Sequence, residues 1–280
     1  MTLFAQLLGV CVVEPDAAAV DAACEVFCRA RRRDWDRALV ELHGHRLAPL
    51  VALAVRRSGL AKGMPRAVVA DLDESFRRTL FANTLQLNLL RDLLASFERA
   101  GIRPTVMKGL AVAARYYPDL GARPMVDIDL CVDASENLAA QRVLGDRGFE
   151  RSAPWRSFLH PDREFAVDLH AEPPSFLATA RDDPTVPFEL DGRADVWEPH
   201  AMLLHLLAHM EKHTRVVGVS LLWVVDVLRL VRAESSSLSL DRLRALSDDL
   251  LISDPQLGAS TGGDQIMVRG APRHVVGYLK

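Results

Sequence analysis

The most informative pattern in the sequence lies in residues 106–132, VMKGLAVAARYYPDLGARPMVDIDLCV. Its last seven residues alternate apolar and polar side chains, and this period of two is typical of a half-buried strand. The alternation places Asp127 and Asp129 on one face of the strand, with Cα atoms about 7 Å apart. Two neighbouring carboxylates repel each other and lower the β propensity of the segment. A divalent cation between them would offset that repulsion, and Mg²⁺ is the ion we expect.

Upstream, the sequence predicts a second strand that ends in a turn. Residues 104–107 (PTVM) combine a proline with β-branched and apolar residues, which favours a short strand. Lys108-Gly109 then turns the chain, and the apolar spacing of residues 110–117 predicts a helix. Gly109 therefore lies at a helix N-terminus, where backbone N–H groups and the helix dipole favour a phosphate, and Lys108 adds a positive charge. A loop with Arg123 leads from this helix to the strand that carries the aspartates.

This order of elements resembles the uncharacterised nucleotidyltransferase family of the polymerase-β-like superfamily, from roughly residue 41 to residue 230. The segments KGLAVAARYY and GARPMVDIDLCV carry the resemblance. In that superfamily a later strand supplies a third acidic residue, which Asp168 matches in the alternating segment FAVDLH. His170 lies on the same predicted strand face as Asp168. The turn departs from the superfamily's usual Gly-Ser, because Lys108-Gly109 lacks the hydroxyl that would contact a phosphate.

Helical regions are predicted on both sides of this core. Between residues 66 and 100, apolar residues recur at three- and four-residue steps, which predicts one long helix or a helix pair. Residues 181–198 are rich in proline and glycine and are predicted to be a loop-rich linker. The expected fold class is α+β, with a small mixed β-sheet core flanked by N- and C-terminal helical regions. The expected division is an N-terminal helical region at 1–100, the core at 101–198, a C-terminal helical region at 199–251 and a flexible, atypical tail at 252–280.

The predicted C-terminal helical region carries His205, His209 and His213 at four-residue spacing, and therefore on one helix face. Three imidazoles in such a row could form part of a polar core, contact a substrate or phosphate, or bind zinc, although a row gives poor tetrahedral geometry. The family resemblance favours a substrate contact, because the family has a histidine-bearing helix followed by a Leu-Trp-x-x-Asp segment. The segment LWVVD matches it and ends at Asp226, which would orient a histidine or contact a cationic substrate.

Composition limits the remaining function classes. The chain has 280 residues, a formal net charge of −3 and a pI near 6.3, so it has no general basic field and a large nucleic-acid footprint is not expected. The four cysteines form no CxxC pair, which favours reduced thiols and a cytoplasmic location. The apolar start at residues 1–13 is too short to span a bilayer as a helix, and no membrane partner is expected.

The end of the chain departs from the family pattern. Residues 258–263 (GASTGG) predict a flexible run. Residues 263–280 resemble a fragment of an ABC-F-type ATPase but contain neither nucleotide motif of that family. We expect a truncated or frame-shifted C-terminus without activity of its own.

The first hypothesis is a Mg²⁺-dependent nucleotidyltransferase that moves a nucleoside monophosphate from an NTP to an unknown small-molecule or protein acceptor. Two alternatives stay open: a catalytically inactive nucleotide-binding or protein-interaction module, and a metal-binding regulatory protein that uses the histidine helix. On the first hypothesis, the catalytic residues that hold two Mg²⁺ ions are Asp127, Asp129 and Asp168. The residues expected to bind the nucleotide are Lys108, Gly109 and Arg123. The possible substrate contacts are His170, His209, His213 and Asp226.

Overall fold

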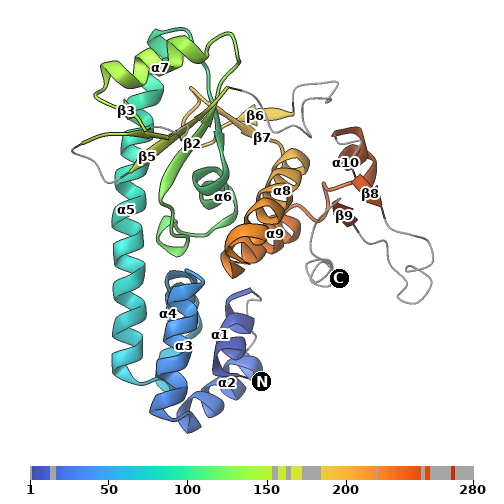
Figure 1. Cartoon of the computed structure of the whole chain (residues 1–280). Helices are drawn as coiled ribbons and strands as arrows, with labels where there is room; N and C mark the ends of the chain where they lie inside the picture. Colours follow the sequence, from blue (N-terminus) through green and yellow to red (C-terminus); the bar gives the residue numbers. More distant parts are fainter. Residues whose placement is uncertain are drawn as a thin grey trace. The chain divides into compact units, whose positions relative to one another are not determined.

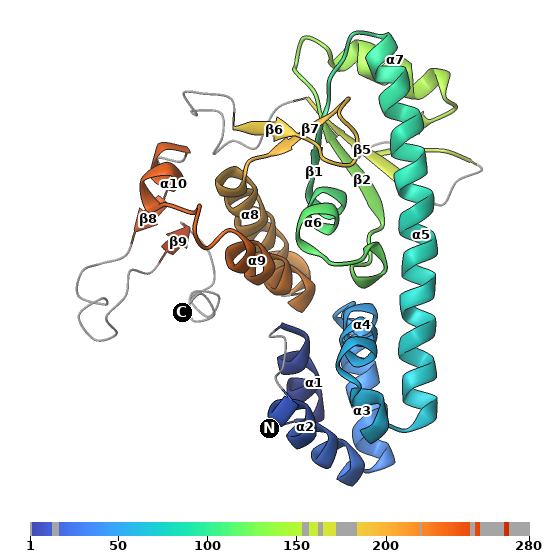
Figure 2. The ribbon, with the colours of Figure 1, turned by 180° about the vertical axis from the view of Figure 1, so that it is seen from behind.

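The structure of the protein is a computed structural model, shown in two opposite views in Figure 1 and Figure 2. It describes residues 2–12, 17–152, 157–161, 165–171, 184–218, 220–246, 250–252 and 266–268. The chain divides into two compact units. The first contains Met1–Leu85, Tyr117–Met125 and Ser220–Val225, and the second contains Gln86–Tyr116, Val126–Val219 and Asp226–Lys280.

The first unit is built from helices. They are α1 (Leu3–Val12), α2 (Ala17–Arg29), α3 (Arg32–Gly44), α4 (Ala48–Ser58), the 3-10 helix η1 (Leu60–Gly63) and the first part of α5 (Arg66–Arg99). Most residues of α4 are buried, and α1 packs against both α3 and α4. Trp35 and Phe27 meet edge to face with ring centroids 5.5 Å apart, a favourable arrangement for two aromatic quadrupoles. The unit therefore has its own apolar core.

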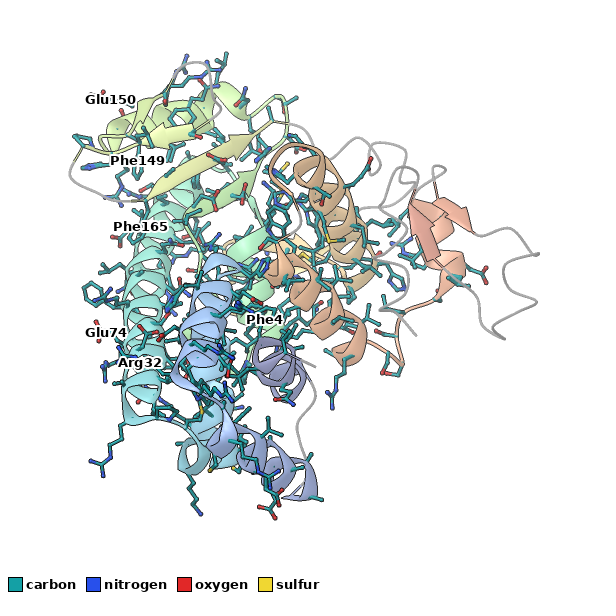
Figure 3. The ribbon with its side chains drawn as sticks, turned by 60° about the horizontal axis from the view of Figure 1, so that its bottom comes forward. Phe4, Arg32, Glu74, Phe149, Glu150 and Phe165 are labelled. Atoms are coloured by element: carbon teal, nitrogen blue, oxygen red, sulfur yellow. The ribbon has the colours of Figure 1, made fainter. Side chains whose placement is uncertain are left out.

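The exposed side of α5 in this unit carries charged residues as well as apolar ones such as Phe81. Glu74, labelled in Figure 3, accepts hydrogen bonds from Arg77 and Arg78 one turn further along the helix. Such exposed pairs at three- and four-residue spacing support a helix only weakly. Among the described residues, no single helix combines the length and the apolar character needed to cross a membrane, and α3 and α4 reach both only as a pair bent by 119°.

The loop that precedes the aspartate strand also belongs to the first unit. It contains the short 3-10 helix η2 (Leu120–Ala122). The side-chain amide of Asn83, which is fully buried, donates to the carbonyl oxygens of Leu120 at 2.5 Å and Arg123 at 2.8 Å. A Cβ atom at Gly121 would lie 2.6 Å from an aromatic ring of α5. Both features fix this loop on the helices of its own unit.

The second unit contains a seven-stranded mixed sheet. Its strands are β1 (Thr105–Met107), β2 (Asp127–Cys131), β3 (Glu150–Arg151), β4 (Ser157–Leu159), β5 (Ala166–His170), β6 (Thr185–Pro187) and β7 (Asp195–Trp197). Their spatial order is β3-β4-β5-β2-β1-β7-β6. At the centre, β2 runs parallel to β5 and antiparallel to β1, while β1 runs parallel to β7. Val106, Ile128 and Val167, one from each of three neighbouring strands, are completely buried.

Helices complete the second unit. They are the remainder of α5, α6 (Lys108–Tyr116), α7 (Asn137–Asp146), α8 (Pro199–Val217), most of α9 (Leu221–Ala233) and α10 (Leu240–Leu246). In both views α6 and α8 lie side by side next to the sheet, and α8 packs on α6 and β7 (Figure 1, Figure 2). A separate antiparallel pair is formed by β8 (Leu250–Ile252) and β9 (Ile266–Val268).

The strands predicted around residues 104–107, 126–132 and 165–170 are confirmed as β1, β2 and β5. The α+β fold class, with helical regions before and after a small mixed sheet, is confirmed as well. The boundaries of the four predicted domains stay a prediction. The predicted flexible run at 258–263 and the rest of the tail lie outside the described residues, apart from Ile252 and Ile266–Val268.

One sequence-based prediction is wrong. Residues 181–198 are not only a loop-rich linker, because β6 and β7 lie within them and β7 pairs with the central strand β1. Each of these strands has three residues, which is too short to show a period of two, and the prolines at 184 and 187 weaken the signal further. Pro187 is tolerated because β6 is an edge strand.

Candidate active site

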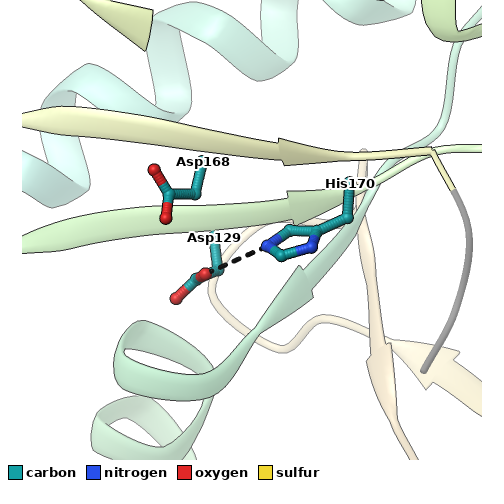
Figure 4. Close-up of side chains that lie close together, drawn as sticks. All are labelled: Asp129, Asp168 and His170. Atoms are coloured by element: carbon teal, nitrogen blue, oxygen red, sulfur yellow. Dashed lines mark hydrogen bonds and ion pairs between the residues drawn. The ribbon is translucent and has the colours of Figure 1, made fainter. Parts of the chain in front are cut away.

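The pairing of β2 with β5 brings the acidic residues together. The two strands are parallel, with Asp129 opposite Asp168 and Cys131 opposite His170. Side chains two residues apart lie on the same face of a sheet, so the side chains of Asp129, Asp168 and His170 lie side by side, as Figure 4 shows. Each offers one ligand atom, and these three atoms lie within 4.8 Å of one another. They form what we call the Asp-Asp-His cluster.

Asp127 lies on β2 on the same face of the strand as Asp129. It starts β2, two residues before Asp129, and lies opposite Ala166 instead of an acidic residue. The described groups that could hold a metal ion include Asp168 and His170 beside Asp129, and they do not include Asp127. The register therefore brings His170, which the sequence suggested only as a substrate contact, to the two carboxylates, and a ligand role of Asp127 stays a prediction.

Asp129 is the most enclosed member of the cluster, since it is only 3 % exposed. Its Oδ1 atom accepts a hydrogen bond from Lys108 Nζ at 2.6 Å and lies 3.3 Å from His170 Nε2. Burial by itself raises the pKa of Asp129, but the hydrogen bond with His170 and the charge of Lys108 outweigh burial and lower it. The Asp129 carboxylate is therefore ionised at neutral pH. The repulsion expected between bare carboxylates is already offset at Asp129 by a lysine.

Asp168 is oriented by the neighbouring strand β4. Ser157 on β4 lies opposite it in the antiparallel register, and the Ser157 hydroxyl donates to Asp168 Oδ1 at 2.6 Å. A short hydrogen bond from a hydroxyl to a carboxylate fixes the direction in which the second oxygen points. Ser157 is a positioning residue that the sequence did not indicate, because its role depends on the pairing of β4 with β5.

Lys108 occupies an unusual backbone conformation. It has φ +45°, in the left-handed region that few residues other than glycine adopt. Such a conformation costs on the order of 1–3 kcal/mol and persists where the surrounding structure holds it. Met107 lies opposite Asp129 in the β1–β2 ladder, so the turn that follows Met107 delivers the Lys108 side chain to Asp129. The next residue, Gly109, is buried in the first turn of α6, as the sequence predicts.

The histidines of α8 lie close enough to Lys108 and Asp129 for these charges to influence their pKa values. Burial, followed by the positive charge of Lys108, lowers the pKa of His205 to about 3 and that of His209 to about 3. The same causes, with the charge of Lys212 between them, lower the pKa of His213. The rings of His209 and His213 lie against each other, with centroids 4.3 Å apart and planes tilted by 45°. His205 is only 6 % exposed. These imidazoles are therefore neutral at pH 7.

Two further residues that the sequence predicts as nucleotide or substrate contacts, Arg123 and Asp226, are buried. Asp226 lies on α9 and is completely buried. Arg123 belongs to the first unit and is 6 % exposed, whereas the Asp-Asp-His cluster belongs to the second unit. A contact of Arg123 with a triphosphate and a contact of Asp226 with a histidine or a substrate both stay predictions.

Comparison with known proteins identifies a family for this chain. A model of the family described as "Uncharacterised nucleotidyltransferase" matches residues 31–256. The chain belongs to this family. The search of curated proteins gave no match. Among solved structures, the solution structure of the antibiotic-resistance factor ANT(2'')-Ia is similar over 59 % of this chain and 90 % of that chain, with 18 % identity and a TM-score of 0.40. That likeness is too low to carry an argument about activity.

The residues of the Asp-Asp-His cluster fit a divalent metal ion. Two carboxylates and one imidazole converge within 4.8 Å, and such oxygen and nitrogen ligands suit several divalent metals. Asp129 remains ionised although it is buried, as a metal ligand must be. The Asp-Asp-His cluster can therefore hold a metal ion, and membership of the family supports nucleotidyl transfer as the reaction class.

Proposed function

We propose that the protein is a Mg²⁺-dependent nucleotidyltransferase that transfers a nucleoside monophosphate from an NTP to a small-molecule or protein acceptor. The observation that carries the proposal is the pairing of Asp129 with Asp168 on parallel strands, beside a lysine-bearing turn at the N-terminus of α6. Two carboxylates and an adjacent cation offer sites for both a metal and a triphosphate.

In the proposed reaction, the acceptor oxygen forms a bond to the α-phosphorus and the bond to pyrophosphate breaks. A bound metal would neutralise charge on the phosphates during this step. Asp129 and Asp168 hold the metal, with Asp127 as a further ligand for a second ion. Asp168, oriented by Ser157, accepts the proton of the acceptor group. His170 contacts the metal or the substrate.

The triphosphate is proposed to lie along the turn between β1 and α6. There the backbone N–H groups that follow Gly109 and the Lys108 ammonium supply positive potential, and Arg123 is proposed as a third contact. The acceptor is proposed to approach α8, whose neutral His209 and His213 can accept or donate hydrogen bonds without adding charge. Asp226 is proposed to orient that part of the site from α9.

The test is transfer of label from α-³²P-labelled NTPs to fractions of a cell extract in the presence of Mg²⁺. We expect the wild type to label an acceptor and Asp129→Asn to lose the transfer. Asp133→Asn is the matched control, because Asp133 is an exposed aspartate two residues beyond β2. Binding of NTP without transfer to any fraction would instead favour a catalytically inactive nucleotide-binding module.

A further inference from the structure

The Lys108 ammonium contacts the same Asp129 carboxylate that a metal ion in the Asp-Asp-His cluster would bind. Within the described residues, the side-chain partners of Asp129 are Lys108, with Nζ 2.6 Å from Oδ1, and His170, with Nε2 3.3 Å from the same oxygen. The pair is enclosed, since the side chains of Lys108 and Asp129 are 20 % and 3 % exposed. Oδ1 of Asp129 is thus committed to an ammonium group before any metal arrives.

A metal in the Asp-Asp-His cluster and the ammonium in its present position compete for the same carboxylate. A divalent ion binds carboxylate oxygens at about 2.0–2.2 Å, which would put two cations around one small group. The Lys108 ammonium and a metal ion bound to the same carboxylate would repel each other strongly in a partly buried site. The histidines of α8 cannot relieve this repulsion, because an imidazole offers no negative charge in either protonation state. Lys108 must therefore find another anion when the metal binds.

The local structure gives Lys108 a way to change partner. Its backbone is fixed at the turn between β1 and α6, but its four-carbon side chain can move the ammonium over several ångströms without a change in the backbone. Gly109, the next residue, lies in the first turn of α6, where a phosphate would be favoured. A triphosphate at this turn carries several negative charges. It would therefore attract the ammonium more strongly than a carboxylate whose single charge is shared with a metal ion.

We propose that Lys108 is an internal competitor for the metal at Asp129, and that a triphosphate removes the competition by taking over the Lys108 ammonium. Metal and nucleotide then bind with positive cooperativity, and by linkage each raises the affinity for the other by the same factor. The second half of this proposal rests on the proposed function, whereas the competition between lysine and metal does not.

The competition is tested with Mn²⁺ alone, whose binding is followed by the loss of the free-ion electron paramagnetic resonance signal. Lys108→Gln keeps a hydrogen-bond donor near Asp129 but removes the charge, so we expect at least about tenfold tighter Mn²⁺ binding than in the wild type. Lys108→Arg keeps the charge and should bind Mn²⁺ no more tightly than the wild type. Lys212→Gln is the matched control, because it removes an exposed lysine charge from α8 without touching Asp129, and it should also resemble the wild type.

The takeover by a triphosphate is tested with inorganic tripolyphosphate, which carries the anion without a base. Water-proton relaxation distinguishes Mn²⁺ bound to the protein from Mn²⁺ bound to the free anion. In the wild type, tripolyphosphate should tighten Mn²⁺ binding, and this gain should be much smaller in Lys108→Gln than in Lys212→Gln. If Lys108→Gln does not fold, the wild type alone tests the cooperativity. An Mn²⁺ affinity of the wild type that tripolyphosphate leaves unchanged would overturn it.

The outcomes separate this inference from the proposed function. Equal Mn²⁺ affinity of the wild type and folded Lys108→Gln, without any anion, overturns the competition even if nucleotidyl transfer is observed. Tighter Mn²⁺ binding in Lys108→Gln, together with no nucleotide transfer to any acceptor, supports the competition and rejects only the proposed function.

Discussion

Asp129→Asn provides the sharpest test of how the site is stabilised without metal. The change keeps the size of the side chain but removes the carboxylate that pairs with Lys108 and contacts His170. Removing one partner of a buried ion pair costs about 3–5 kcal/mol because the other charge is left uncompensated. Lys108 is 20 % exposed and its ammonium can turn toward water, so we expect the free energy of unfolding to fall by about 2–3 kcal/mol.

The assay is urea unfolding in metal-free buffer, with the midpoint and the m value fitted together. Asp168→Asn keeps an oxygen that can accept from the Ser157 hydroxyl and removes only the charge that strengthens this bond, so it should cost about 1 kcal/mol or less. Asp133→Asn should be nearly neutral, because Asp133 is exposed. In the double variant Asp129→Asn with Lys108→Met, the loss should be smaller than the sum of the single losses, since the unpaired charge is gone.

The pH dependence of the Asp129→Asn effect follows from the direction of the pKa shift. The folded-state pKa of Asp129 lies below the unfolded value of about 3.9. The stabilisation is therefore fully present above about pH 4 and is lost as the pH falls through the lowered pKa. A loss below about 0.5 kcal/mol at pH 7 would contradict this expectation, because a loss that small is typical of an exposed ion pair and would mean that the Lys108–Asp129 pair contributes little to stability.

Three other measurements test different parts of the molecule. His170 adds an imidazole to two carboxylates, so Co²⁺ should bind more tightly than Mg²⁺, and His170→Asn should reduce that preference; equal preference in both proteins would remove His170 from the ligand set. His205 has a folded-state pKa of about 3, below its unfolded value of about 6.5, so it stabilises fully above pH 6.5, and stability should fall by about 1 kcal/mol per pH unit below it. His205→Gln should reduce this slope between about pH 6.5 and 5, with the share of His209 remaining because its pKa is also about 3, and an unchanged slope would contradict the buried neutral state of His205. Deleting residues 258–280 removes β9 from a two-stranded sheet that is separate from the central sheet, and because a two-stranded sheet is marginally stable, the melting temperature should stay nearly unchanged; a fall of about ten degrees, or several kcal/mol at this size, would show that the tail packs on the core.

The central strands could be predicted because their signals are local. The alternation around Asp127 and Asp129 and the one around Asp168 each identify a strand and the face on which the acids lie. Alternation does not give the register between strands, and the register selects the ligands. Asp129 pairs with Asp168, and this alignment leaves Asp127 opposite Ala166 while His170 reaches the cluster. A histidine two residues after the predicted third acid was the one available signal.

The strands β6 and β7 could not be predicted for a different reason. Three residues in an extended conformation carry almost no periodic information, and the stability of β7 comes from pairing with β1, which lies about ninety residues earlier in the chain. Arg103 strengthens this pairing through hydrogen bonds to Asp195 at 2.7 Å and to the carbonyl oxygen of Gly192 at 2.7 Å. Contacts between residues this far apart in sequence override the local preference of a segment rich in proline and glycine.

The place of Lys108 joins the folding of the site to its proposed chemistry. A carboxylate as enclosed as Asp129 would be costly in a protein without metal if no cation compensated it, so the fold needs a positive charge there before any ligand binds. A fixed charge would then obstruct the metal. Lysine on a strained but fixed backbone satisfies both requirements, since the turn at φ +45° sets where the side chain starts and the flexible stem allows the ammonium to leave. An arginine would keep the compensation, but its planar, multidentate group would hold Asp129 more firmly. The strained turn, which costs about 1–3 kcal/mol, thus places the ammonium beside Asp129 in the metal-free protein.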